Sequence, residues 1–438
     1  MTSLLKYFFN KFKNSSYLFS GNLTKKSHFS EIDYRIEGDL INIDIPMLKL
    51  SNAAYQIDGQ PMFKVFDQVQ RLEREGRKIL HFELGEPDFD TPINIVNAGI
   101  SSLRNGDTHY TNSMGLFELR ESVAETTLKS RGFKPDVNQV LITPGANAII
   151  YYTIHCVVNQ GEEVIVPDPG FPTYFSAIKA CGANAVSVPL REKNNHQLKF
   201  DDVKKLITDK TKLIIINSPS NPTGALTSKE DICQIHELCV KKGIYILSDE
   251  IYSRSVFGDN GKFFSPSMID HCKHNVIVLN GFSKAFAMTG WRIGAAIGPE
   301  HLIEKMGLLL QTINSCVPVF IQKAAIEAIN GDQSEVNKMK DEYSERRKVL
   351  VNGLNSIDGI RCALPSGSIY AFANVSGLGM TGEEFADFIL NKANVALLPG
   401  SSFGQYADDF VRICYVNSIE NINLAITNIK TALKNRRN

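Results

Sequence analysis

The sequence predicts an α/β fold, with a large domain built on a mostly parallel, helix-covered sheet and a smaller α+β domain. Two observations predict it. From about residue 140 to residue 298, short β-branched apolar runs recur with helix-like segments between them, which is the rhythm of parallel β-α-β units. After residue 298 a long helical pattern is followed by short strands among helices, which is typical of a separate α+β unit.

The strands of the large domain are predicted from short apolar runs that end in turn-forming residues. In chain order they cover residues 79–84, 140–142, 163–166, 212–217, 243–248 and 276–279. In the smaller unit the same criterion predicts strands at residues 360–364, 369–374, 395–398 and 410–416. Each run is too short for a helix of typical length and long enough for a buried strand.

Helices are predicted where charged and apolar residues alternate at helical spacing, or where a small-residue loop opens an apolar segment. They cover residues 61–76, a segment that opens at 118–120, the apolar segment that runs through 158, residues 229–242, and residues 301–354 with a turn at 330–332. Cys233, His236 and Cys239 fall within one of these helices without a fourth ligand, so they indicate packing and no metal site is predicted.

Composition narrows the class of protein. The chain has 438 residues, enough for two or three domains, and its 47 basic and 47 acidic residues give no electrostatic case for nucleic acid or membrane binding. No apolar run approaches the roughly 20 residues that a membrane span needs. The 8 cysteines are scattered, which favours a reducing compartment over a disulfide framework, and we expect a cytoplasmic protein.

The first 44 residues differ from the rest and are predicted to be an N-terminal extension. Lysines stand at positions 6, 11, 13, 25 and 26, and no acid precedes Glu31. A targeting peptide for an organelle matrix has this kind of composition, but arginine is absent before Arg35. A partly disordered extension is therefore the favoured interpretation, with the targeting peptide as the alternative.

A lysine in a small-residue turn is the strongest sign of chemistry. Lys284 follows the strand at 276–279 and has Phe282, Phe286 and Met288 as neighbours. Apolar surroundings disfavour an ammonium ion, so the pKa of this lysine should fall, which makes it a candidate amine nucleophile. Arg292 lies eight residues on, and its permanent guanidinium suits a phosphate dianion.

The whole stretch 280–294 resembles the pyridoxal-phosphate attachment site of class I/II aminotransferases, enzymes of fold type I. The resemblance implies that Lys284 carries the cofactor, that Arg292 binds its phosphate, and that Ser283 also contacts the cofactor. It covers about residues 45–438. By the same resemblance residues 45–85 are an N-terminal arm with part of the small domain, 86–325 the large cofactor domain, and 326–438 the small C-terminal domain.

Other motifs extend the predicted cofactor site. The loop at 143–148 feeds a helix N-terminus, where free amides and the helix dipole favour an anion, so Gly145, Ala146 and Asn147 are phosphate candidates. The resemblance further implies roles for aromatic and polar residues around the cofactor ring: Phe171 stacks on it, Asn221 and Tyr252 bond its phenolic oxygen, and Asp249 pairs with its protonated nitrogen.

Substrate and subunit contacts are also implied by the resemblance. The Gly85 amide faces the substrate carboxylate, together with Asn221 and Arg412, and Tyr110 reaches the phosphate of the neighbouring subunit in a homodimer with a shared active site. Arg412 stands inside an apolar strand, where an unpaired charge is costly and a carboxylate partner is expected. Some aspartate-specific relatives carry a lysine at the position of Asn147, so we expect no aspartate preference.

The sequence thus predicts an aminotransferase that moves an amino group between an L-amino acid and a 2-oxo acid, with Lys284, Asp249 and Tyr252 as catalytic residues. Two alternatives share its motifs. One is a relative with another fate for the carbanion, such as a C–S lyase, and the other is a non-catalytic pyridoxal-phosphate-binding regulator. The regulator is disfavoured because the lysine motif is intact and the first 44 residues lack a helix-turn-helix pattern.

Overall fold

The computed structural model describes residues 24–26, 29–36, 39–46, 48–55, 59, 61–258 and 262–437. The chain divides into two compact units, Met1–Tyr55 and Gln56–Asn438. In the first unit, β1 (Thr24–Lys26), β2 (Phe29–Ile36) and β3 (Asp39–Pro46) form an antiparallel sheet, and α2 spans Asn52–Tyr55. Residues 1–23, which hold the first half of the predicted extension, lie outside the described residues.

The second unit is built on a seven-stranded sheet, called here the central sheet, with the order β5-β11-β10-β9-β8-β6-β7. Its strands are β5 (Val140–Thr143), β6 (Glu163–Asp168), β7 (Asn184–Pro189), β8 (Thr211–Asn217), β9 (Tyr245–Asp249), β10 (Val276–Gly281) and β11 (Gly294–Ile297). Strand β11 runs antiparallel to both of its neighbours, and the other pairs are parallel.

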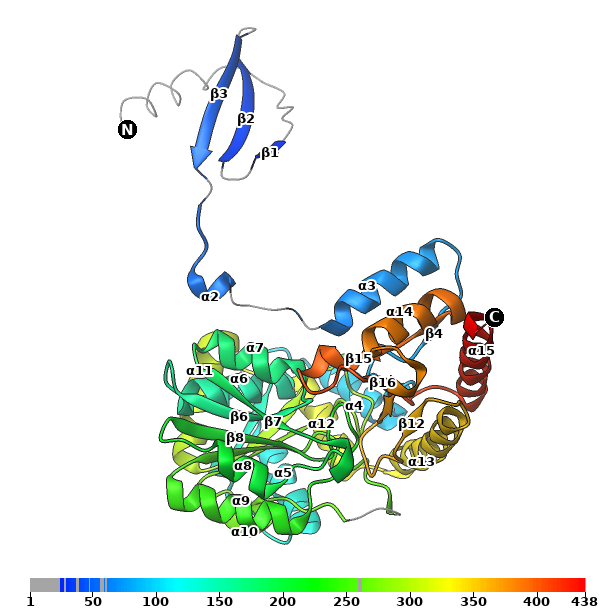
Figure 1. Ribbon diagram of the computed structural model, residues 1–438. Helices are drawn as coiled ribbons and strands as arrows, with labels where there is room; N and C mark the ends of the chain where they lie inside the picture. Colours follow the sequence, from blue (N-terminus) through cyan, green and yellow to red (C-terminus); the bar gives the residue numbers. More distant parts are fainter. Residues whose placement is uncertain are drawn as a thin grey trace. The chain divides into compact units, whose positions relative to one another are not determined.

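Helices cover both faces of the central sheet (Figure 1). One face packs against α6 (Ala146–Val157), α7 (Pro172–Ala180) and α11 (Glu300–Asn314), and the other against α5 (Phe117–Arg131), α8 (Phe200–Leu206) and α9 (Lys229–Lys242). Strand β10 shows how the sequence dictates this arrangement. Val276 and Val278 belong to one hydrophobic cluster, while Ile277 and Leu279 belong to the other, because successive side chains point to opposite faces.

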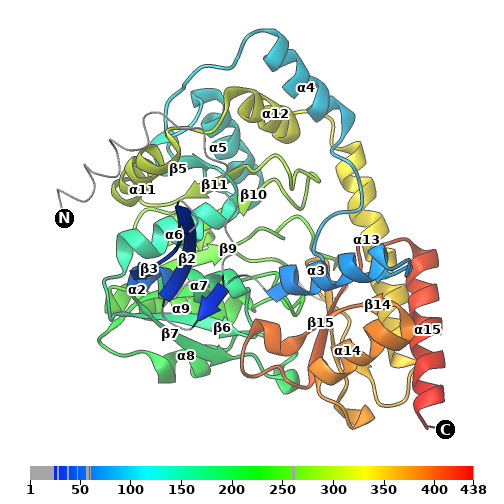
Figure 2. The ribbon, with the colours of Figure 1, turned by 90° about the horizontal axis from the view of Figure 1, so that it is seen from above.

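A second sheet of four antiparallel strands, called here the small sheet, has the order β12-β13-β16-β15. Its strands are β12 (Arg361–Cys362), β13 (Tyr370–Asn374), β15 (Leu398–Pro399) and β16 (Phe410–Cys414). Helices α13 (Ser334–Asn355), α14 (Gly382–Ala393) and α15 (Ile419–Arg437) pack around it (Figure 2). Nearby, β4 (Leu80–His81) pairs in parallel with β14 (Val395–Ala396).

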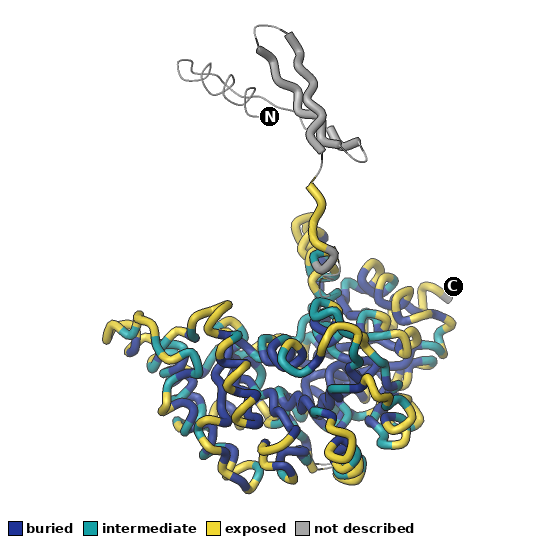
Figure 3. The backbone as a smooth tube through the Cα atoms, turned by 90° about the vertical axis from the view of Figure 1, so that its left-hand side faces the viewer, coloured by how far each residue is buried: buried dark blue, intermediate teal, exposed yellow. Residues whose placement is uncertain are grey.

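The remaining α-helices of the second unit lie outside the two sets just described. They are α3 (Pro61–Arg74), α4 (Ile93–Arg104), α10 (Ser267–Asp270) and α12 (Val319–Asn330), and α4 packs against α12. Figure 3 shows the exposed stretches on the outside of the second unit around a buried interior. None of the helices in the described ranges is both long enough and apolar enough to cross a membrane.

The predicted fold class is confirmed, since the central sheet is mostly parallel and helix-covered and the small sheet lies among helices. Several elements differ from the sequence prediction. Strands β7 and β11 were not predicted, and the strand predicted at 79–84 is only two residues long as β4. The helical segment predicted at 301–354 has a second interruption at 315–318, where Ser315 adopts a positive φ of 64° before Pro318.

Candidate active site

A cavity of about 410 Å³ lies where three parallel strands of the central sheet end. Asn217 ends β8, Asp249 ends β9, and Lys284 stands in the turn after β10; all three line the cavity. This is the edge of an open α/β sheet at which ligands bind. The predicted site residues that line it are Gly85, Ala146, Asn147, Phe171, Asn221, Asp249, Tyr252, Ser283, Lys284 and Arg292.

Lys284 is partly buried, and its Nζ donates a hydrogen bond to the carbonyl oxygen of Gly85. Burial lowers the pKa of this lysine from 10.5 to about 8, because an ammonium ion loses its hydration inside the protein. The nearby guanidinium groups of Arg412 and Arg292 act in the same direction, while the Cys414 thiol opposes them. Lys284 is therefore neutral far more often at physiological pH than an exposed lysine, as a nucleophile or general base requires.

The N-terminus of α6 forms an anion cradle beside Lys284. Gly145 is its N-cap with φ 82°, and no side chain caps the free amides of the first turn. The guanidinium of Arg292 packs so closely against Gly145 that a β-carbon there would overlap it. Four groups thus surround one end of the cavity, namely the helix amides with their dipole, Arg292, Asn147 and Ser283, and together they suit a phosphate monoester.

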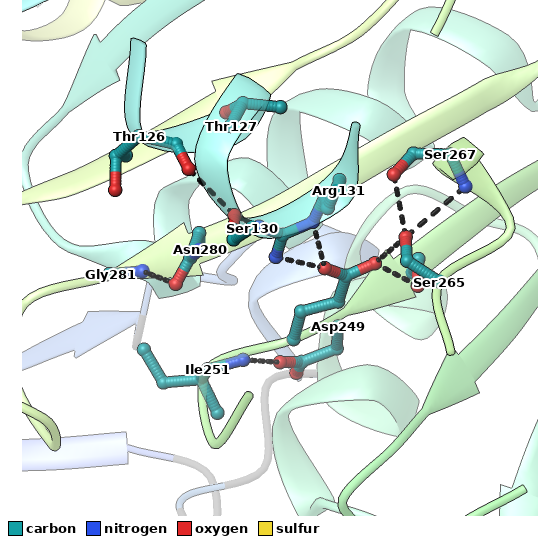
Figure 4. Close-up of polar contacts among 12 residues, drawn as sticks. Thr126, Thr127, Ser130, Arg131, Asp249, Ile251, Ser265, Ser267, Asn280 and Gly281 are labelled. Carbon is teal, nitrogen blue, oxygen red and sulfur yellow. Dashed lines mark hydrogen bonds and ion pairs between the residues drawn. The ribbon is translucent and has the colours of Figure 1, made fainter. Parts of the chain in front are cut away.

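Asp249 is buried at the end of β9 and accepts two hydrogen bonds from neutral groups. The Tyr174 hydroxyl donates at 2.5 Å and the Ile251 amide at 3.2 Å, the latter drawn in Figure 4. Burial raises the pKa of this carboxyl from 3.8 to about 6, and the two hydrogen bonds partly oppose the rise. A buried carboxylate without a cationic partner in the described residues suits a protonated ring nitrogen.

Aromatic side chains shape the middle of the cavity. Phe171 lies edge-on to Tyr174, with ring centroids 5.7 Å apart. The hydroxyls of Tyr252 and Tyr370 are 3.0 Å apart, and a β-carbon at Gly85 would overlap the Tyr370 hydroxyl. A flat ring held between these walls would meet an aromatic face on one side and hydroxyl donors at its edge.

Arg412 is fully buried in β16, behind the cavity wall. It donates to the Glu83 carbonyl and, at 3.2 Å, to the Asn221 side chain, and its guanidinium lies 4.2 Å from the Tyr370 ring centroid. Its Nε has no hydrogen-bond partner, and no carboxylate of the described residues forms an ion pair with it. A buried cation with an unused donor is a strong attractor for a substrate carboxylate.

Two predicted residues besides Arg412 do not line the cavity. Gly145 lies behind Arg292, as described above, and Tyr110 is 87% exposed in the loop before α5. Conversely, sequence reasoning missed Tyr174, Tyr370, Met62, Phe63 and Ile150 as lining residues. Tyr174 could have been found, because it follows Phe171 by three residues and so shares one face of α7 with it.

The residues present fit pyridoxal phosphate on structural grounds. An uncapped helix N-terminus with Arg292 matches the phosphate, the buried Asp249 matches the ring nitrogen, and Lys284 with a lowered pKa matches the aldehyde. Within the described ranges, no group of three or more histidine, cysteine, aspartate or glutamate residues is placed so that it could hold a metal ion.

Comparison with known proteins gives consistent matches. Residues 77–429 match the family described as aminotransferase class I and II. The chain is 39% identical over 373 residues to an aspartate aminotransferase of Pyrococcus horikoshii, covering 85% of this chain and 94% of that protein. It is 37% identical over 394 residues to aromatic-amino-acid aminotransferase 2 of Thermococcus litoralis, covering 89% of this chain and 100% of that protein.

Solved structures match equally well. The structure of aspartate aminotransferase from Thermus thermophilus with maleate superimposes with a TM-score of 0.84 at 30% sequence identity. The match covers 88% of this chain and 100% of that one. The fold and the sequence therefore agree over the same part of the chain.

Proposed function

The chain belongs to the class I and II aminotransferases, a pyridoxal-phosphate-dependent family, and on that premise we propose that its reaction takes place in the cavity around Lys284. The enzyme is a transaminase, and its relatives act on amino acids and 2-oxo acids. The observation that carries the proposal is the convergence of a lysine with a lowered pKa, an anion cradle and a buried carboxylate on one cavity.

We assign the cofactor to the following residues. The helix amides at Ala146 and Asn147, with Ser283 and Arg292, hold the phosphate, and Phe171 covers one face of the ring. Asp249 holds the ring nitrogen, and Asn221 and Tyr252 bond the phenolic oxygen. When bound, pyridoxal phosphate supplies an aldehyde for the amine and a ring that accepts the electron pair released at the substrate α-carbon.

The chain's own groups then move one proton. Neutral Lys284 Nζ would take the proton from the substrate α-carbon and return it to the carbon of the cofactor's aldehyde, as its pKa of about 8 permits near neutral pH. Asp249, ionised above its pKa of about 6, keeps a positive charge on the ring nitrogen. The two roles complement each other. Proton removal by Lys284 leaves an electron pair on the α-carbon, and the charged ring nitrogen that Asp249 would hold stabilises that pair.

Arg412 and the neighbouring Asn221 receive the α-carboxylate of either substrate. Arg412 offers a donor that the protein leaves unused, and the aromatic rings of Tyr370 and Phe403 flank its guanidinium. The Gly85 amide adds a backbone donor on the same side. Since amino acid and 2-oxo acid both carry this carboxylate, one binding mode serves both halves of the exchange.

A donor panel tests the proposal. Purified, cofactor-loaded enzyme should convert several L-amino acids to 2-oxo acids over many turnovers only when 2-oxoglutarate or pyruvate is present, with stoichiometric amination of the acceptor. Release of ammonia and a thiol from cysteine or cystathionine, without any need for an acceptor, would instead assign the chain to C–S lysis. Cofactor binding with no turnover of either kind would favour a regulator.

We also propose a homodimer whose two sites are shared, in a reducing compartment such as the cytoplasm. All eight cysteines are free. Tyr110 and Phe117, 87% and 64% exposed, are large apolar groups that a partner subunit would cover. We assign residues 86–325 to the large domain, residues 45–85 to an N-terminal arm with part of the small domain, and residues 326–438 to the small C-terminal domain. Pairing of β4 with β14 supports grouping Leu80–His81 with the small domain.

Subunit mixing tests the shared site. Lys284→Ala and Tyr110→Ala variants are made separately, under conditions where each is nearly inactive, then unfolded together and refolded. Mixed dimers then hold one site with both lesions and one with neither, so random pairing restores about a quarter of wild-type sites. No recovery in a sample shown to contain mixed dimers would assign Tyr110 to its own subunit's packing.

A further inference from the structure

The residue after Asp249 carries a second buried carboxylate, on the opposite face of the sheet. Glu250 is fully buried and does not line the cavity. Arg131, the last residue of α5, donates to one of its oxygens through Nε at 3.0 Å and through Nη2 (Figure 4). The other oxygen accepts from Ser248 Oγ at 2.9 Å and from the Ser265 hydroxyl.

This ion pair has no part in the reaction described so far, and a buried ion pair adds little stability on its own. The side chain of Arg131 is only 6% exposed, so both charges have lost their hydration. A pair of apolar residues of similar volume would fill the same space at a lower cost in free energy. Its position, directly behind the carboxylate that holds the cofactor ring, suggests an electrostatic purpose.

The charged groups around Asp249 are few. From its own strand Glu250 raises the pKa of Asp249, although burial is the larger cause. On either side, Asp249 lies in register with Asn217 of β8 and Leu279 of β10, neither of which titrates. From the covering elements, Tyr174 of α7 donates to it. The other charged or titratable residues that line the same cavity are Glu86, Tyr252, Lys284, Arg292 and Tyr370.

We propose that Arg131 and Glu250 form a positioning and charge-compensating pair for Asp249: Glu250 anchors the end of β9, and Arg131 offsets part of the charge of Glu250, which favours an ionised Asp249. The proposal rests on the proposed function, in which an ionised Asp249 holds the ring nitrogen. Glu250 anchors the turn in two ways, by its side-chain bonds to α5 and to Ser265, and by its backbone amide, which donates to the Leu279 carbonyl of β10 at 2.9 Å.

If Arg131 compensates the charge of Glu250, the two single substitutions should shift the pKa of Asp249 in opposite directions. Arg131→Gln removes the cation, leaves Glu250 as an uncompensated anion and so raises the pKa of Asp249. Glu250→Gln removes the anion, leaves Arg131 and so lowers it. A role confined to packing predicts the same direction for both variants, because each breaks the same pair of side chains.

The measurement is the dissociation constant of pyridoxal phosphate from apoenzyme, determined by visible absorption between pH 5 and pH 8. Wild-type affinity should fall as pH drops past about 6, where Asp249 takes up a proton. The midpoint should rise by about one pH unit in Arg131→Gln and fall by a similar amount in Glu250→Gln, as expected for one charge several ångströms away. Near the midpoint each shift changes the dissociation constant by up to about tenfold.

Pyridoxal phosphate also titrates, but its titration is the same in every experiment. Differences between variants therefore report the titration of the protein. Asp249→Asn gives the profile without this carboxyl, and Arg131→Lys, which keeps the charge, should restore the wild-type midpoint. The double variant with both glutamines should have a midpoint between those of the two single variants. If Arg131→Gln does not fold, the Glu250→Gln midpoint and the rescue by Arg131→Lys still decide.

Midpoints that move together, or a Glu250→Gln midpoint that stays or rises, would overturn the inference. Wild-type protein that binds no pyridoxal phosphate at any pH would overturn the proposed function instead. The two failures are therefore distinguishable in one set of titrations.

Discussion

The central sheet and the small sheet hold their functional charges in different ways. Asp249 and Lys284 stand at or just beyond strand ends of the central sheet, where their partners are neutral groups. Arg412 stands in the middle of β16, with backbone and amide oxygens as acceptors and aromatic rings around its guanidinium. Asp249 and Lys284, at the strand ends, can change their protonation near neutral pH. Arg412, in the small sheet, keeps its positive charge.

This difference separates chemistry from recognition. Groups that must gain and lose protons have pKa values displaced toward neutrality, to about 8 for Lys284 and about 6 for Asp249. The group that we propose to recognise a carboxylate is an arginine, which stays protonated even when buried. Substitutions in the two sheets should therefore produce different kinetic signatures.

The largest effect is expected from Lys284→Ala. Loss of a residue that is both covalent anchor and general base should lower transamination at least about ten-thousandfold, while cofactor still binds non-covalently. In the wild type, borohydride should fix the cofactor to the peptide that contains Lys284, as mass spectrometry would detect. Lys340→Ala is the matched control: this exposed lysine of α13 lies in an adjacent cavity and should be dispensable. Substantial turnover by Lys284→Ala would contradict the assignment.

Asp249→Asn should come next, with turnover lowered about a hundredfold to a thousandfold, because an amide cannot hold a positive charge on the ring nitrogen. Cofactor affinity should fall far less, since the phosphate cradle is untouched. Steady-state kinetics and equilibrium dialysis measure the two effects separately. Near-normal turnover would remove Asp249 from the mechanism.

The same substitution should stabilise the apoenzyme. Folded Asp249 holds its proton up to about pH 6 and unfolded aspartate loses it near 3.8, so the folded state binds more protons between these values and stability falls as pH rises through this range. Above pH 6 the penalty is complete, up to about 3 kcal/mol. Urea unfolding should therefore show apo Asp249→Asn more stable than wild type at pH 7 and little different near pH 4.

How far the sequence predicted this arrangement differs between the two sheets. In the central sheet, β-branched strands followed by small-residue turns led to the prediction of Asp249 and Lys284 as site residues, because each residue stands at the end of a predicted strand or just after it. Strand β11 escaped prediction because its residues, Gly294–Ile297, are mostly small and lack the β-branched pattern. The break at 315–318 could have been predicted from Pro318.

In the small sheet the sequence predicted that Arg412 needs a carboxylate but not what surrounds it. Its contacts with Tyr370 and Glu83 join segments far apart in the chain, and periodicity carries no information on such pairs. The Arg131–Glu250 pair is hidden for the same reason. Glu250 directly follows Asp249 in the chain, but its partner Arg131 lies 119 residues upstream.

Arg412→Lys should have a smaller and different effect. A lysine keeps the charge and loses the planar fork, so kcat/KM should fall about tenfold to a hundredfold for every donor and acceptor, with cofactor affinity unchanged. Arg347→Lys is the matched control, because Arg347 is equally buried and lies over the Phe257 ring, away from the cavity. It should reduce stability and leave KM near wild type. Equal KM changes in both variants would mean that Arg412 is only structural.

The smallest effect concerns the side chain of the substrate. Asn147 lines the cavity as an uncharged residue, and Met62, Phe63 and Ile150 line it with apolar surface. We therefore expect wild type to show no strong preference for aspartate over neutral or aromatic donors, although its relatives include enzymes named for either class.

Asn147→Lys adds a cation that an ω-carboxylate can pair with. It should raise the kcat/KM ratio of aspartate to phenylalanine about twofold to fivefold, the size of one partly exposed charge pair. Asn147→Gln, which adds length without charge, should leave the ratio unchanged. A wild-type enzyme that already prefers aspartate by a large factor over every neutral donor would show that another residue recognises the ω-carboxylate.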